Sequence, residues 1–166
     1  MAMRPSSSKC PDPRRGSAVL AVALAAALQG GACGATSSDQ AAAPPSFATA
    51  PFQTVTSSSG RLRVELRWSP AVPVKGENAA QLTFLDQNGN PVTGLVTTVV
   101  PWMPAHAHGT SVQPAVTSTG PGTVVAAPVY LYMAGEWQIR MTMTTTSATL
   151  VSETADDDAV GTVQIP

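Results

Sequence analysis

Both histidines of this 166-residue chain lie in one short segment near its middle, residues 101–110, with the sequence Pro-Trp-Met-Pro-Ala-His-Ala-His-Gly-Thr. His106 and His108 are separated by a single residue. In an extended strand such residues point to the same side, with Cα atoms about 6–7 Å apart. Two imidazoles at that separation can bind one ion, so this segment is the candidate metal site of the sequence.

Two methionines, Met103 and Met133, could add thioether sulfur to the imidazoles. Imidazole and thioether ligands without a nearby carboxylate or thiolate favour copper over zinc, calcium or magnesium, because soft ligands select Cu(I). The same residues also have a structural interpretation. The methionines would then pack in the core, and the histidines would hydrogen-bond loop carbonyls or contact a partner. The sequence leaves both interpretations open.

The first 33 residues have the pattern of a secretory leader. A polar, basic stretch precedes the uncharged apolar run 17–28, which is too short to cross a bilayer as a helix, since that requires about 20 apolar residues. Small residues then lead to Cys33, and segment 29–34 resembles the lipobox of bacterial lipoproteins. The resemblance implies cleavage before Cys33, lipid on its thiol and attachment to a membrane. Ordinary cleavage nearby is the alternative.

The residues after the leader divide into a spacer and a domain. Segment 34–51 is built mainly of Ala, Ser, Thr, Gln and Pro without apolar periodicity, which predicts a flexible linker. We expect the folded domain to span 52–166. Five basic and nine acidic residues follow position 33, a net charge of −4, so the basic surface of a nucleic-acid-binding protein is lacking.

The domain has the sequence pattern of β-structure. Residues 61–68 alternate between charged positions and the apolar residues Leu62, Val64, Leu66 and Trp68, as in a strand with one buried face. Further strands are predicted over 78–85, 95–100, 112–117, 123–133, 136–145 and 160–165. Pro128 indicates an edge position or a bulge in its strand. The polar stretch 144–158 ends in three aspartates, which are more typical of a solvated turn than of a calcium site. The expected fold is an all-β, immunoglobulin-like antiparallel sandwich of about seven or eight strands.

Two motifs of the domain occur together in one known family. The segment Met103-Pro-Ala-His-Ala-His-Gly109 is followed by Pro114 and then by Tyr-Leu-Tyr-Met-Ala-Gly-Glu-Trp at 130–137. Together they resemble the YtkA-like domain, which is related to the FixH group of small bacterial envelope proteins. The resemblance covers 61–165 and implies an immunoglobulin-like sandwich, an extracytoplasmic location and no established enzyme activity. FixH-type members are associated with cation handling and with assembly of copper-containing oxidases.

The sequence contains none of the usual catalytic arrangements. It has no Gly-x-Ser-x-Gly motif, no phosphate-binding loop, no cysteine in the domain and no carboxylate beside the histidines. We therefore expect no enzyme, but an exported, lipid-anchored envelope protein that binds copper, or assists its delivery, through His106 and His108. The alternative is a non-catalytic interaction or assembly module of the cell envelope that contacts another protein and binds no metal.

Overall fold

A computed structural model describes residues 43–145 and 156–166. The predicted leader, Cys33 and the first part of the linker lie outside these residues. Within the described part, the chain forms nine β-strands and one short 3₁₀ helix: β1 (Gln53–Thr56), β2 (Arg63–Ser69), β3 (Gly76–Leu85), β4 (Leu95–Met103), η1 (Pro104–His106), β5 (His108–Gly109), β6 (Ala115–Gly120), β7 (Thr123–Leu131), β8 (Gly135–Thr145) and β9 (Asp157–Ile165). No helix of this part is long and apolar enough to cross a bilayer.

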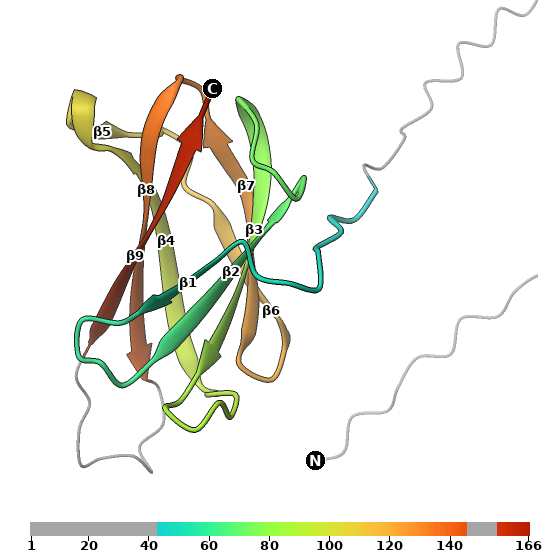
Figure 1. Cartoon of the computed structure of the whole chain (residues 1–166), viewed down its shortest axis with the longest axis vertical. Coiled ribbons are helices and arrows are strands. Elements are labelled where there is room, and N and C mark those ends of the chain that lie inside the picture. Colours follow the sequence, from blue (N-terminus) through green and yellow to red (C-terminus); the bar gives the residue numbers. More distant parts are fainter. Residues whose placement is uncertain (1–42, 146–155) are drawn as a thin grey trace, which may run out of the picture. The chain divides into compact units, whose positions relative to one another are not determined.

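The strands form two antiparallel sheets that face each other (Figure 1). One sheet has the order β1-β2-β3-β7-β6 and the other the order β5-β4-β8-β9. The predicted all-β sandwich is therefore confirmed. The described strands number nine instead of seven or eight, because β1 and β5 are only four and two residues long and carry too short a pattern to be recognised in the sequence.

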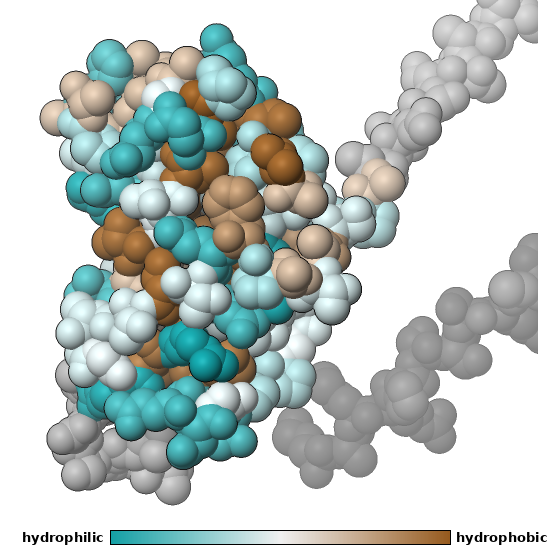
Figure 2. Space-filling model, viewed as in Figure 1, coloured by the Kyte–Doolittle hydropathy of each residue, from teal (hydrophilic) through white to brown (hydrophobic). Residues whose placement is uncertain are grey.

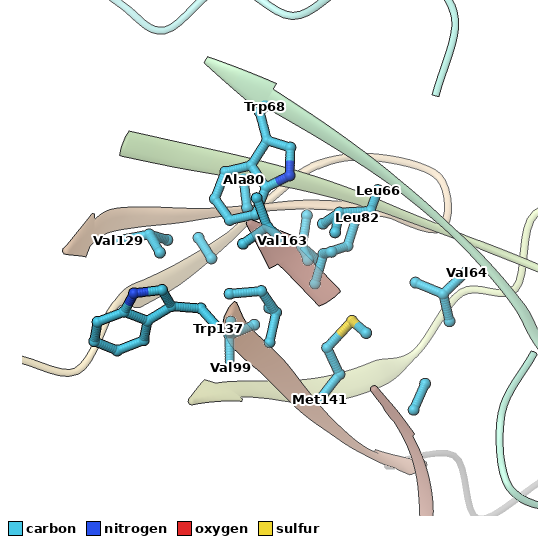
Figure 3. Close-up of a cluster of buried hydrophobic side chains, with 14 of the residues drawn as sticks. Val64, Leu66, Trp68, Ala80, Leu82, Val99, Val129, Trp137, Met141 and Val163 are labelled. Atoms are coloured by element: carbon cyan, nitrogen blue, oxygen red, sulfur yellow. The ribbon is translucent and has the colours of Figure 1, made fainter. Parts of the chain in front are cut away.

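One apolar core fills the space between the sheets (Figure 3). The alternation predicted for β2 is present, since Val64, Leu66 and Trp68 are all buried. β8 contributes Trp137 and Ile139, followed by a pair of methionines. Its methionines, Met141 and Met143, are each 1% exposed, as their phase in the strand predicts. The described residues, 43–145 and 156–166, belong to one compact unit that contains this whole core. On the face seen in Figure 2, hydrophobic residues form separate groups between hydrophilic ones.

β7 departs from one of the sequence predictions. It lies between β3 and β6, so the edge position that Pro128 suggested is wrong. The alternative, a bulge, is confirmed: the β3–β7 register shifts between Asn78 and Ala80, opposite Ala127 and Pro128. The irregularity accommodates a residue that has no N–H to donate to the neighbouring strand.

Of the three aspartates expected in a solvated turn, Asp157 and Asp158 belong to the start of β9, and Asp156 directly precedes it. Asp157 is 4% exposed and accepts hydrogen bonds from Ser58 Oγ (3.2 Å), Ser59 Oγ (2.6 Å) and the Ser59 backbone N–H (3.1 Å). Ser58 Oγ also lies 2.8 Å from the Asp158 carboxylate. The turn between β1 and β2 is thereby fastened to the last strand of the other sheet, a contact between distant segments that local sequence patterns do not indicate.

This contact predicts how stability depends on pH. Burial raises the pKa of Asp157, but hydrogen bonds from Ser59, Ser57 and Ser58 outweigh burial and lower the pKa from 3.8 to about 2. Because folding lowers this pKa, the ionised Asp157 carboxylate stabilises the folded protein at pH values above 3.8, the pKa in the unfolded chain, by about 2 kcal/mol. This contribution is lost as the pH falls towards 2. Between about pH 5 and about pH 2, we expect the free energy of unfolding to fall by about 2 kcal/mol more in the parent than in Asp157→Asn. Equal losses in chemical denaturation would contradict the assignment.

The two buried tryptophans differ in their hydrogen bonding. Trp137 Nε1–H donates to the Met133 carbonyl oxygen at 2.9 Å, whereas Trp68 Nε1–H is buried without an acceptor among the described residues. Both indoles are 1% exposed. Replacement by Phe removes a similar volume at each site, but only Trp137→Phe breaks a bond. We expect Trp137→Phe to be more destabilising than Trp68→Phe by about 1 kcal/mol in urea unfolding. The reverse order would show that the indole N–H bond contributes nothing.

Candidate metal centre

The histidine segment lies at one end of the sandwich, where β4 leaves the sheet and returns as β5 (Figure 1). β4 ends at Met103, helix η1 covers Pro104–His106, and β5 pairs back onto β4 through Trp102 with Gly109 and Met103 with His108. The expectation that both histidines lie in an extended segment is therefore wrong. They flank a tight turn, and this turn determines the direction of each ring.

Local sequence explains part of this turn. Pro104 occupies the first position of the 3₁₀ helix, where its fixed φ fits and its missing N–H costs nothing. The Ala107 N–H donates to the Pro104 carbonyl oxygen at 3.2 Å, and Ala107 adopts the left-handed region with φ 54°. Gly109 permits close pairing, since a Cβ at this position would lie 2.7 Å from the Pro101 carbonyl oxygen. Pro104 and Gly109 thus favour the turn, whereas Ala107 opposes it.

The turn brings the two imidazoles together in solvent. Their ring centroids are 5.7 Å apart with an angle of 44° between the planes, and both residues are exposed. His108 Nδ1 lies 3.0 Å from the Gly109 carbonyl oxygen. Because a carbonyl can only accept, Nδ1 carries the proton, and Nε2 of the neutral ring keeps its lone pair for a ligand. Such a backbone contact is the usual way in which a metal-binding histidine is oriented.

The two methionines are placed differently from the histidines. Met103 is 2% exposed, and its ε-methyl reaches towards Gly135, where a Cβ would approach it to 2.7 Å. Met133 is partly buried against the core, and its carbonyl oxygen holds the indole of Trp137. Both side chains therefore contribute to packing in this structure. For its sulfur to bind an ion at the histidines, Met103 would have to leave the core.

A tryptophan and an arginine beside the turn were not identified from the sequence. The Arg140 guanidinium lies 4.5 Å from the ring centroid of Trp102, in a cation–π contact. Arg140 also donates to Gln138 Oε1 at 3.1 and 2.9 Å. The pairing of β4 with β8 sets Val100 opposite Arg140 and so brings Arg140 near Trp102. The sequence alone does not reveal this register, so the contact could not be predicted from it. The contact places a fixed positive charge on the sheet that carries the histidines.

The donor set within the described residues is small. Nowhere in 43–145 or 156–166 do three or more His, Cys, Asp or Glu side chains gather as a metal-binding group. The histidine pair can therefore supply two imidazole nitrogens, and remaining ligands would come from water or a partner. Among divalent first-row metals, nitrogen sites of this kind bind copper most tightly. The residues fit copper better than zinc, whose structural sites use four protein ligands.

The left-handed Ala107 predicts an unusual effect of glycine. We expect Ala107→Gly to raise the free energy of unfolding by about 0.5–1 kcal/mol, because the Cβ is disfavoured in this region. Ala107→Val should lower it by more than about 1 kcal/mol, since a branched side chain fits the left-handed region poorly. Ala105→Gly is the matched control. Ala105 lies in η1 without a positive φ, so glycine there should destabilise. The account of the turn fails if Gly destabilises both positions equally.

Neither the curated proteins nor the solved structures include a significant match. A family model described as YtkA-like matches residues 56–142, more than half of the chain. The matched region includes the turn with both histidines, the whole of β4 and most of β8, the strands that hold the turn. The chain therefore belongs to the YtkA-like family.

Proposed function

We propose that this protein is an exported, lipid-anchored member of the cell envelope that binds copper, or assists its delivery, through His106 and His108. The observation that carries the proposal is the pairing of two exposed imidazoles, with ring centroids 5.7 Å apart, at a turn that the fold specifies. The contact of His108 Nδ1 with the Gly109 carbonyl leaves Nε2 available to the ion.

The small number of ligands favours delivery over permanent storage. Two side chains in solvent leave most of the coordination sphere of a bound ion open, so a partner can add its own ligands before the histidines release the ion. The thioethers of Met103 and Met133, which the sequence offered as soft donors, are engaged in packing in the structure. Met103 is buried in the structure, so the histidines are the primary ligands of the proposal.

The location is proposed from the sequence of the leader. A basic stretch, the apolar run 17–28 and small residues before Cys33 form the pattern of an exported lipoprotein. Lipid on Cys33 would tether the domain, and the linker from 34 would give it reach from the membrane surface. A domain with an exposed two-histidine site on such a tether is suited to meeting membrane-bound copper proteins.

A competition titration of residues 43–166 against a chromogenic Cu(I) chelator tests the proposed site. We expect the parent to hold one equivalent of copper and His106→Ala/His108→Ala to lose more than about 100-fold in affinity, since even the residues that orient metal ligands contribute 10–100-fold. Met103→Leu is the matched control and should retain binding, because leucine can replace a buried methionine at little cost.

Each variant distinguishes between the alternatives. A parent that fails to compete would refute the copper site and favour the metal-free interaction module. Loss of binding in Met103→Leu, with the fold retained by circular dichroism, would assign Met103 as a ligand and refute the primary role of the histidine pair.

A further inference from the structure

The connection between β2 and β3 is apolar although it lies at the surface. Residues 70–75 have the sequence Pro-Ala-Val-Pro-Val-Lys, with no polar side chain before the final lysine, and only Pro73 among them is buried. Val72 is 72% exposed, more than any other large hydrophobic residue in the described part of the chain, and Val74 is 45% exposed. Surface connections are normally built from Gly, Asn, Asp and Ser. A contiguous exposed apolar stretch is instead typical of an interaction site.

A buried asparagine fixes this connection in its exposed position. The Asn78 side-chain oxygen accepts the Val74 N–H at 2.9 Å, and its amide nitrogen donates to the carbonyl oxygens of Val74 at 2.8 Å and Gly76 at 3.1 Å. Asn78 itself is 3% exposed. Because these three hydrogen bonds hold the backbone, the connection cannot collapse onto the core, and the fold keeps Val74 at the surface.

A stacked tyrosine pair extends the same surface. The β3–β7 register sets Gly76 opposite Leu131, which brings Lys75 and Tyr132, the next residue along each chain, to neighbouring positions. Tyr132 is 53% exposed. Its ring stacks on that of Tyr130, with centroids 5.1 Å apart and an angle of 9° between the planes. The stack restricts the Tyr132 ring, so this aromatic side chain is also presented to solvent in a defined position.

These side chains form one surface at the histidine end of the sandwich. The connection between β2 and β3 lies at the end where β4 runs into η1 and β5 (Figure 1). Figure 2 shows hydrophobic residues at the surface of this end. We call the surface the apolar tip, and it consists of Val72, Val74, Lys75 and Tyr132.

The N-terminal segment joins the domain close to the apolar tip. Arg67 Nε–H donates to the Thr49 carbonyl oxygen at 3.1 Å, two residues before β2 ends, and the Arg67 guanidinium pairs with the Glu65 carboxylate at 2.8 Å. Thr49 follows Cys33 by 49 − 33 = 16 residues. A flexible chain of this length spans about 20–24 Å. A lipid on Cys33 would therefore hold the apolar tip within this distance of a membrane.

We propose that the apolar tip docks on a lipid surface, with Val72 and Val74 at the boundary between headgroups and acyl chains. The other two residues suit the layers above that boundary. Tyr132 has an amphipathic ring of the kind enriched at membrane interfaces, and Lys75 can extend its ammonium group to lipid phosphates. The lipid on Cys33 belongs to the proposed function, whereas the docking residues lie outside the histidine site.

The size of the apolar tip and its tether favour a lipid surface over a protein partner. A stable protein interface takes about 20–30 residues from each side, far more than this tip offers. A lipid surface needs no matching shape, and burial of a valine side chain contributes about 1.5–3 kcal/mol. The tether adds an effective concentration in the millimolar range, so a weak contact is sufficient. Docking of the tip would turn the histidine end towards the membrane.

Cosedimentation with vesicles of phosphatidylcholine and phosphatidylglycerol tests the tip without its tether. Residues 43–166 are suitable because the described ones belong to one compact unit with its own core. We expect the parent to be half bound at about 1–10 mM lipid, the range of a contact of about 3–4 kcal/mol. Val72→Asp/Val74→Asp should weaken binding at least about tenfold, because two carboxylates resist transfer to the interface.

Two valines elsewhere provide the matched control. Val96 and Val160 are 53% and 42% exposed and lie in β4 and β9 of the four-stranded sheet. Val96→Asp/Val160→Asp adds the same charge as the tip variant, so general repulsion from anionic lipid is equal, and this variant should bind like the parent. A parent that does not bind the vesicles, or an equal loss in both variants, would overturn the proposal.

Spin-labelled lipid locates the contact without any substitution. In bicelles that contain a phospholipid with a nitroxide on its acyl chain, we expect the methyl signals of Val72 and Val74 in the parent to broaden. The methyl signals of Val96 and Val160 should not change. Broadening of neither pair, or equal broadening of both, would contradict docking through the tip.

The histidine variant separates this proposal from the copper site. His106→Ala/His108→Ala should bind vesicles like the parent, so failure of the copper titration leaves the docking result unchanged. Val72→Asp/Val74→Asp should in turn keep the copper affinity of the parent. Loss of vesicle binding in the histidine variant would overturn the assignment of the contact to the apolar tip.

Discussion

Packing of the two sheets through one apolar layer is the interaction on which the rest of the structure depends. Both cysteines of the chain precede the domain, so no disulfide can support it, and the layer containing Trp68 and Trp137 carries the stability. The bond from Asp157 to the serines after β1 closes one end of the sandwich. With this frame fixed, the connection after β4 can adopt a strained turn without loss of the fold.

That turn links the core to the candidate chemistry. Met103 enters the core at the end of β4, and the chain reverses through η1 and Ala107 so that His106 and His108 emerge on the outside. An alanine in the left-handed region costs about 1–2 kcal/mol, which the pairing of β5 with β4 must offset. Strain held beside exposed polar groups is a common feature of binding sites, because it fixes side-chain direction before a ligand arrives.

Sequence patterns predicted the parts of the fold that rest on local periodicity. The alternation in β2 and the phase of Met141 and Met143 in β8 specify burial directly, and the structure agrees. The predictions that were wrong concern features that depend on contacts between distant segments. The start of β9 is ordered by serines about a hundred residues earlier, and the central position of Pro128 depends on which strands flank β7. The identity of residue 107 does not predict a positive φ, since alanine rarely adopts one. The histidine pair could be identified from residue type and spacing. The arrangement of its two rings could not, because it depends on the turn formed by η1 and Ala107.

The central claim is that the two imidazoles, and not the buried sulfur of Met103, hold the ion. X-ray absorption spectroscopy of the Cu(I)-loaded domain, residues 43–166, tests this most directly, because nitrogen and sulfur scatterers are distinguishable at the metal. The account predicts a first shell that contains imidazole nitrogen from His106 and His108 and lacks a thioether sulfur. A shell with sulfur and without imidazole would contradict it, and would mean that Met103 or Met133 leaves its packed position to bind copper.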